Sequence, residues 1–221
     1  QGLFGKYTVT LKLYPAIVTL HLLGGVALLA LLVVQREAFR DRALALPAAL
    51  RRLAVWTTAL LVLQIALGGW VSTNYAVLAC QGFPTCNGQW WPAMNLAEGF
   101  TILRELGHTG QGDLLSFDAL VGIHFVHRVF AIVVLGAIGW LAWRLMQHTE
   151  VRRYGLGLAA LGVLQLASGL SNVVLGWPIA AALGHSAGAA ALVFVLTQLL
   201  ARSARPVAAA AREGGTRVAA A

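Results

Sequence analysis

Charge is what this sequence has least of. Only 11% of its 221 residues are Asp, Glu, Lys or Arg, whereas soluble domains carry about 25%. Acidic side chains are the rarest, since 8 Asp and Glu stand against 16 Lys and Arg. Hydrophobic residues make up 59% of the chain, and its mean hydropathy is +0.76. This composition excludes a soluble globular domain and indicates an integral membrane protein.

The net charge of +8 does not indicate a nucleic-acid partner. The basic residues are gathered at the ends of long apolar runs, which is the orientation signal of membrane proteins. We therefore expect a lipid bilayer, and no nucleic acid, as a partner.

Cysteine is nearly absent as well. Cys80 and Cys86 are the only two, and five residues that include Gly and Pro separate them. This spacing permits a small disulfide-closed loop, which an oxidising exterior would favour. Reversible redox use of the pair is the alternative that the sequence leaves open. No CxxC or HExxH pattern is present, which disfavours a zinc site.

Five apolar runs are long enough to cross a bilayer core of about 30 Å as helices that rise about 1.5 Å per residue. The expected fold class is therefore an all-α integral membrane protein with five transmembrane helices. The runs cover residues 16–34, 53–72, 118–143, 154–175 and 179–201. We expect four segments: a first span within 1–35, a basic loop at 36–52, four further spans in 53–201, and a disordered tail at 202–221.

Arginines determine the expected orientation. They crowd into the 36–52 loop, the 144–153 loop and the tail, whereas the 73–117 loop carries acidic residues and many Gly, Pro, Asn and Trp. By the positive-inside rule, the arginine-rich side is cytoplasmic. We therefore expect a multi-pass protein of the cell inner (plasma) membrane, with the 73–117 loop outside.

Four histidines lie inside the apolar runs, where ionisable side chains are costly and usually functional: His21, His124, His127 and His185. His21, His127 and His185 each lie roughly 9–14 Å along their helix from its outer end. Histidines that only pack would have no reason to share one leaflet. His108 and His148 fall in loops, and we expect no special role for them.

Two imidazoles on neighbouring membrane helices suit the iron of a haem. Small residues beside His21 and His185 leave room for a flat macrocycle and for close helix approach. A proton relay is the alternative, but Asp118, at a helix end, is the only candidate carboxylate. Arg128, next to His127, would bind a haem propionate or snorkel to the surface.

The chain also repeats itself. The order aromatic, Pro, His, then Gly three residues and Ala six residues further on, occurs around His21 and again around His185. Residues 63–68 and 164–169 echo each other in the same way. Such repeats in membrane proteins usually mean duplicated halves. If a half has four helices, the first span belongs to another half, so we expect a fragment or a processed form of a longer chain.

Several stretches together resemble the C-terminal half of the haem A synthases, a family of cytochrome oxidase assembly proteins. They are residues 1–13, 67–80, 83–86, 124–128 and 169–178. The resemblance covers nearly the whole chain except the tail. It implies one half of a duplicated eight-helix fold, in which the last four helices form a four-helix haem-binding bundle. The family oxidises a methyl group of haem O to the formyl group of haem A.

The resemblance also assigns roles to single residues. Carried over by motif, His127 and His185 are the ligands of a haem b, and Arg128 contacts this cofactor. His21 is a catalytic residue on the side of the substrate haem. Cys80 and Cys86 match the family's extracellular cysteine pair. Haem O is the implied substrate, and haem O synthase and cytochrome oxidase assembly factors are the implied partners.

One family feature has no counterpart in the sequence. The N-terminal half of the family carries another His-Arg helix preceded by a glutamate, and Glu37, in the expected basic loop, cannot replace that glutamate. We therefore expect this chain alone to bind haem b without oxidising haem O. The alternative is a bis-histidine haem b protein for electron transfer. A third interpretation is a colourless assembly factor in which His127 and His185 only pack.

Overall fold

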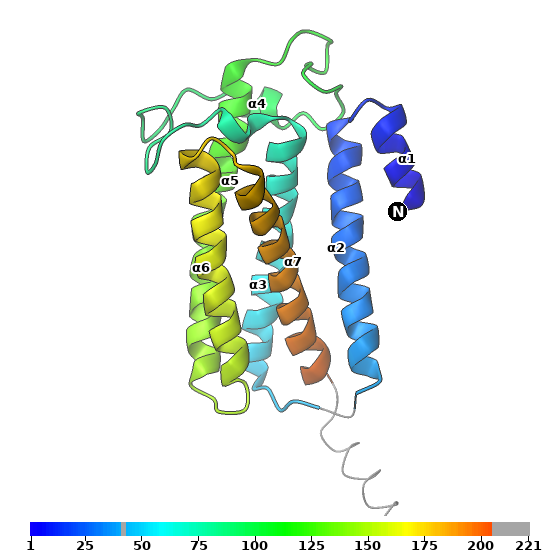
Figure 1. The fold of residues 1–221 in the computed structure, drawn as a ribbon, viewed down its shortest axis with the longest axis vertical. Coiled ribbons are helices and arrows are strands. Elements are labelled where there is room, and N and C mark those ends of the chain that lie inside the picture. The colour runs from blue at the N-terminus through cyan, green and yellow to red at the C-terminus, as the bar shows by residue number, and fades with distance from the viewer. Residues whose placement is uncertain (41–42, 205–221) are drawn as a thin grey trace, which may run out of the picture.

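The computed structural model describes residues 1–40 and 43–204, so the expected tail lies outside the described residues from 205 onward. Five helices are long and apolar enough to cross a membrane, as the hydropathy predicted. They are α2 (Pro15–Ala38), α3 (Ala48–Thr73), α5 (Phe117–Met146), α6 (Arg152–Val174) and α7 (Ile179–Ser203) (Figure 1). The predicted all-α membrane fold is therefore confirmed.

Four of these helices form a bundle, and α2 stands beside it (Figure 1). Around the bundle α3 packs on α5, α5 on α6, α6 on α7, and α7 on α3. α5 and α7 are therefore diagonal to each other and make no direct helix contact along their described lengths. α2 packs against α7 and α3 from outside this ring.

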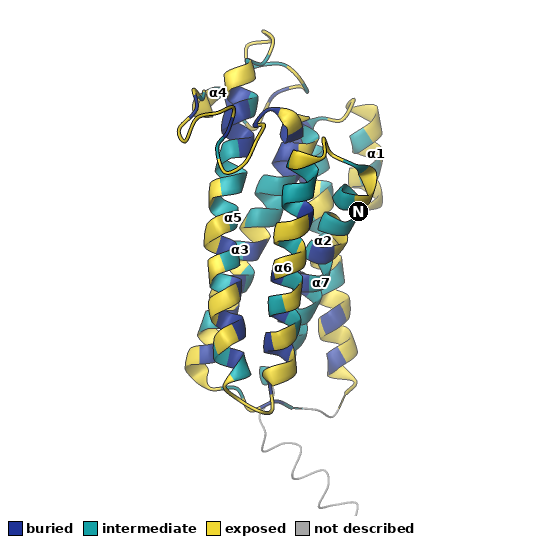
Figure 2. Ribbon diagram, turned by 60° about the vertical axis from the view of Figure 1, so that its left-hand side comes forward, coloured by how far each residue is buried: buried dark blue, intermediate teal, exposed yellow. Residues whose placement is uncertain are grey.

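Apolar packing is concentrated at one end of the bundle. The large buried side chains there come from the first parts of α3 and α6 and the last parts of α5 and α7; they include Leu61, Ile138, Leu141, Leu158, Leu192 and Leu196. We call this end the core half, and the opposite end, which carries residues 74–116, the loop half. Large apolar residues are exposed on the helices, which suits a lipid environment. Figure 2 shows exposed residues, in yellow, along the length of the helices.

The loop half contains short helices that the hydropathy did not predict. Residues 1–14, which precede the first apolar run, form α1 (Gly2–Thr10) and a turn that folds this helix back against α2 (Figure 1). Two more short elements, η1 (Ala76–Leu78) and α4 (Leu96–Gly99), lie between α3 and α5. The hydroxyl of Ser116 then accepts the amide N–H of Ala119 at 3.2 Å and caps the start of α5.

Two helix ends differ from the expectation, and both bring charge into the fold. Glu37, expected in the basic loop, lies on α2 and is only 3% exposed. Its carboxylate accepts from Arg36 at 3.0 Å and from Gln198 at 2.8 Å. Arg202, expected in the tail, belongs to α7, lies 3.8 Å from Glu37, and donates to the hydroxyl of Tyr154. The partners of each buried charge offset the cost of removing it from water. Both helices can therefore extend beyond the apolar runs that the sequence predicted.

Candidate functional site

The structure brings two of the intramembrane histidines together. His127 on α5 and His185 on α7 occupy the two diagonal helices of the bundle, in the loop half. The other two helices of the ring, α3 and α6, each hold one of these histidines in place.

α3 holds His127 with a glutamine and a glycine. The side-chain amide nitrogen of Gln64 donates to the His127 carbonyl at 3.2 Å and lies 3.1 Å from its Nδ1 and 3.4 Å from its Nε2. One turn further along, a Cβ on Gly68 would come within 3.0 Å of the imidazole Cε1. The missing side chain of Gly68 therefore makes the space in which the His127 ring lies.

α6 holds His185 with the same two residue types and a serine. The amide nitrogen of Gln165 donates to the His185 carbonyl at 2.8 Å. A Cβ on Gly169 would come within 3.3 Å of the imidazole Cε1. Between them, the hydroxyl of Ser168 lies 2.9 Å from Nδ1 of His185.

His21 on α2 has the same surroundings, supplied by α1. The amide nitrogen of Gln1 donates to the His21 carbonyl at 2.8 Å, and a Cβ on Gly5 would lie 3.4 Å from the His21 ring. Glutamine followed four residues later by glycine therefore supports each of the three histidines. Sequence reasoning noticed this pattern on the second and fourth spans but missed it in α1, although the common spacing is visible in the sequence.

The segments around His21 and His185 repeat each other closely. The supporting glutamine precedes the histidine by 20 residues in both. Each connecting turn contains two consecutive residues with positive φ, Lys12 and Leu13 in the first turn and Gly176 and Trp177 in the second. The internal repeat predicted from sequence therefore extends to backbone conformation.

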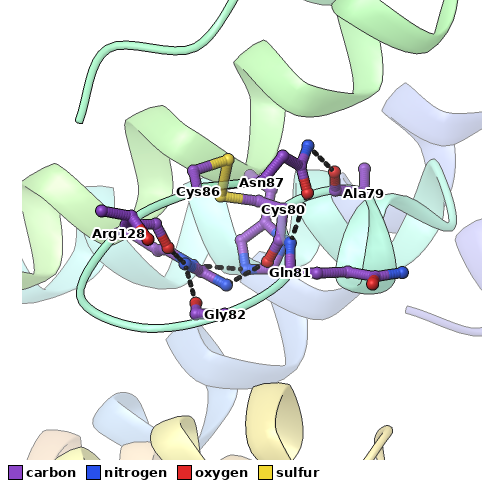
Figure 3. Close-up of a disulfide and its surroundings, with 9 residues drawn as sticks. Ala79, Cys80, Gln81, Gly82, Cys86, Asn87 and Arg128 are labelled. Atoms are coloured by element: carbon purple, nitrogen blue, oxygen red, sulfur yellow. Dashed lines mark hydrogen bonds between the residues drawn. A yellow bond between two sulfur atoms is a disulfide. The ribbon is translucent and has the colours of Figure 1, made fainter. Parts of the chain in front are cut away.

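Arg128 joins α5 to the loop half. Its guanidinium donates to the carbonyl of Cys80, to that of Gly82 at 2.9 Å and to that of Thr85 at 3.4 Å (Figure 3). Its Nε donates to Nε2 of the buried His124 at 3.2 Å. Sequence reasoning weighed a propionate contact against snorkelling, and the structure places the side chain against loop carbonyls.

The two cysteines form the predicted disulfide, which closes the loop that Arg128 contacts (Figure 3). Both cysteines are buried. The amide of Asn87 holds the loop further, because it donates to the Ala79 carbonyl and accepts the amide N–H of Gln81, both at 2.9 Å. The disulfide loop is therefore fixed on one side by Arg128 and on the other by Asn87.

Two charged residues order the rest of the loop half. Arg104 is 3% exposed, donates to Asn74 at 2.6 Å and lies over the ring of Trp70. Its burial lowers the pKa of the guanidinium. The carboxylate of Glu98 accepts the amide N–H and the hydroxyl of Ser116 at 2.6 and 2.8 Å. Those hydrogen bonds, with a smaller contribution from Arg104, lower the pKa of Glu98.

The available donor set fits a haem better than a bare metal ion. No group of three or more His, Cys, Asp or Glu side chains that could hold a metal is found among the described residues. What remains is a pair of imidazoles from diagonal helices, each facing a glycine. His108 lies in the loop with its Nδ1 3.1 Å from the Leu106 carbonyl, and His148 lies in the turn after α5, as expected for histidines outside the site.

Fold and site together define a multi-pass membrane protein that places histidines in one half of a helical bundle. The model of the family of cytochrome oxidase assembly proteins (COX15-CtaA) matches residues 1–197. The chain therefore belongs to this family, as the sequence motifs predicted.

Several curated relatives are named heme A synthase. The protein of Shewanella oneidensis is 36% identical over 203 residues, which cover 90% of this chain and 62% of the relative. That of one strain of Methylorubrum extorquens is 31% identical over 230 residues, 99% of this chain and 57% of the relative. That of Halalkalibacterium halodurans is 27% identical over 198 residues, 84% of this chain and 58% of the relative. The chain thus spans 57–62% of the length of these relatives.

Proposed function

We propose that this chain holds a haem b in the loop half of the bundle, with His127 and His185 as axial ligands. The observation that carries this proposal is that both histidines are held by the same pair of residue types. On each neighbouring helix a glycine makes room for the imidazole ring, and a glutamine four residues earlier holds the backbone of the histidine. When bound, the haem supplies a redox-active iron.

We propose further that this centre serves the oxidation of a methyl group of haem O to the formyl group of haem A. Support comes from the family membership and from relatives named heme A synthase. His21, which has the same kind of support from α1, stands on the side of the substrate haem. Haem O synthase and cytochrome oxidase assembly factors are the partners that such a role requires.

The side chains of this chain bind and orient the cofactor. Glutamine and glycine set the height and tilt of both imidazoles, and the packed core half closes one end of the site to water. Arg128 reaches the site from the loop side. A haem propionate would compete there with the Cys80, Gly82 and Thr85 carbonyls, and a carboxylate is the stronger acceptor for a guanidinium.

The proposed setting is the cell inner membrane, with the loop half outside and the arginine-rich core half facing the cytoplasm. The positive-inside rule supports this orientation. The Cys80–Cys86 disulfide supports it as well, because disulfides persist in oxidising compartments.

A second candidate is a bis-histidine haem b protein that only transfers electrons. One observation favours it: both histidines and both supports belong to the ring of α3, α5, α6 and α7, so the haem b site needs no other helix. Because this chain alone is expected to leave haem O unoxidised, the test uses the chain joined to the part of the Shewanella oneidensis relative that it does not cover. Formation of haem A by the joined protein, given haem O, a reductant and oxygen, supports the synthase, and unchanged haem O with a reducible haem b supports electron transfer.

The first experiment is an absorption spectrum of the detergent-purified chain, oxidised and reduced, with extraction of the haem. A six-coordinate, low-spin haem b at about one per chain is expected. His127→Ala and His185→Ala should each lose the six-coordinate spectrum, whereas His124→Ala and the control His148→Ala should keep it. A chain that stays colourless after haem is added would refute the haem b site.

A further inference from the structure

The two proposed ligands differ in the chemical group that contacts their ring nitrogens. His185 is contacted at Nδ1 by a hydroxyl, whereas His127 is contacted by an amide nitrogen. A neutral imidazole carries one proton, and the hydrogen bond to one nitrogen decides which nitrogen keeps a free lone pair. Iron binds that free lone pair.

The hydroxyl of Ser168 is placed to accept from His185. A hydroxyl has one hydrogen, and the shortest contact of the Ser168 oxygen is with the Leu164 carbonyl at 2.7 Å, which can only accept. With the hydrogen in that bond, the contact of 2.9 Å with Nδ1 of His185 is one that the imidazole donates. Nδ1 carries the proton, and Nε2 of His185 is left with its lone pair free.

Gln64 can only donate to His127. Its amide nitrogen has two hydrogens and no lone pair, and it lies 3.1 Å from Nδ1, 3.4 Å from Nε2 and 3.2 Å from the His127 carbonyl. If it donates to Nδ1, the proton of the ring sits on Nε2. If it donates to Nε2, it occupies the ligating lone pair itself.

Rotating the amide in place does not resolve the conflict. Exchange of its oxygen and nitrogen would set Oε1 against the His127 carbonyl, so that two acceptors would face each other. In the structure Oε1 of Gln64 is buried and has no hydrogen-bond partner among the described residues. The Gln64 side chain must therefore move before Nε2 of His127 binds iron.

We propose that the two ligands are not equivalent: Ser168 fixes His185 as the preset ligand, and Gln64 makes His127 the exchangeable one. This inference rests on the proposed haem site. Ser168 and Gln64 are positioning residues, which act on the iron only through the imidazoles. A hydrogen bond donated by Nδ1 raises the basicity of a ligand histidine, so Ser168 also lowers the reduction potential of the haem.

The chain offers a matched control for each residue. Ser171 lies on the same helix as Ser168, and its hydroxyl donates to the Ala167 carbonyl. Gln147 lies at the end of α5, outside the site, and its amide nitrogen donates to the Trp143 carbonyl at 3.3 Å. Ser168→Ala is therefore compared with Ser171→Ala, and Gln64→Leu with Gln147→Leu.

Two measurements on the haem-loaded chain test the inference. Ser168→Ala should shift the midpoint potential upward, with Ser168→Thr restoring it and Ser171→Ala leaving it unchanged. Carbon monoxide should displace His127 in the reduced protein, and Gln64→Leu should weaken the binding of carbon monoxide several-fold while Gln147→Leu does not. Equal potentials in both serine variants, or equal carbon monoxide affinity in both glutamine variants, would overturn the corresponding assignment.

A third measurement does not depend on haem. Nitrogen NMR of histidine-labelled, haem-free protein in bilayers reports which ring nitrogen of His185 carries the proton. Nδ1 is expected in the wild type and in Ser171→Ala, and a mixture of both forms in Ser168→Ala. Protonation at Nε2 in the wild type would overturn the role of Ser168. A colourless protein would refute the proposed function, and this spectrum would still decide the tautomer.

Discussion

The two halves of the bundle use buried polar groups differently. In the core half, the polar groups at the ends of α2 and α7 contact one another, since Glu37 bonds Gln198 and lies near Arg202, which donates to Tyr154. Among the described residues, only Thr57 in that half has a buried side-chain atom without a hydrogen-bond partner. The loop half has five such side chains: His21, Gln64, Arg104, His124 and Asn172. Unsatisfied buried polar atoms are costly.

This difference separates scaffold from site. A region in which nearly all buried polar groups are paired offers few further hydrogen bonds to a ligand. A region that keeps imidazoles beside glycines, with hydrogen-bonding atoms unused, has room and partners for one. Substitutions in the core half should therefore change stability and spare the cofactor spectrum, and those in the loop half should do the reverse.

The largest expected effect is in the core half. Glu37→Ala removes a carboxylate whose side chain is 2% exposed, which accepts from Gln198 at 2.8 Å and lies 3.8 Å from Arg202. Removing one partner of a buried ion pair costs about 3–5 kcal/mol. Thermal unfolding in detergent should show this loss, and Glu150→Ala, at an exposed turn, should not. A lost haem spectrum in folded Glu37→Ala protein would contradict the separation of the two halves.

A cavity in the core half should have the next largest effect. Leu196 is fully buried in the apolar cluster, and Leu→Ala at such a site costs about 2–5 kcal/mol. The matched control is Leu31→Ala, because Leu31 is 64% exposed on α2. The ratio of haem to folded protein should be the same in both variants. If Leu196→Ala changed the axial ligation, the core half would be part of the site.

Much of this molecule could be predicted from sequence because the signals are local. Hydropathy alone located all five spans, and counting from their ends placed His21, His127 and His185 in the same half. The hydrogen bonds between Gln64 and His127 or between Gln198 and Glu37 connect residues 63 and 161 positions apart. No local pattern encodes such pairs, so the fold was needed to show which histidine each glutamine and glycine supports, and that Glu37 is buried.

The tight space beside His127 predicts a smaller effect in the loop half. Gly68→Ala would place a methyl group 3.0 Å from the imidazole Cε1, so the ring must shift by a few tenths of an ångström. Partial loss of haem is expected. The free energy of unfolding should change by about 1 kcal/mol, which is the difference in helix propensity between Gly and Ala. Gly136→Ala on α5, where the new Cβ meets nothing within 4 Å, should gain that stability and keep its haem.

The smallest expected effect concerns the loop half without its cofactor. Hydrogen bonds from Ser116 lower the pKa of Glu98 in the folded protein. A carboxyl group with a lowered folded pKa contributes stability above its unfolded pKa, about 4.3, and loses it as the pH falls through the folded pKa. Glu98→Gln should therefore flatten the acid side of the stability profile measured by thermal unfolding between pH 7 and pH 3.

The serine separates this effect from a general acid response. Ser116→Ala removes the hydroxyl but keeps the amide N–H that also binds Glu98, so it should flatten the profile only in part, and the double variant should match Glu98→Gln alone. Because Glu98 lies on the surface of the loop half, the haem spectrum should follow the wild type in all three variants. If Glu98→Gln left the acid side of the stability profile unchanged, the hydrogen bonds from Ser116 to Glu98 would not persist in solution. Arg104 and Arg128 would then be the charged residues that order the loop half.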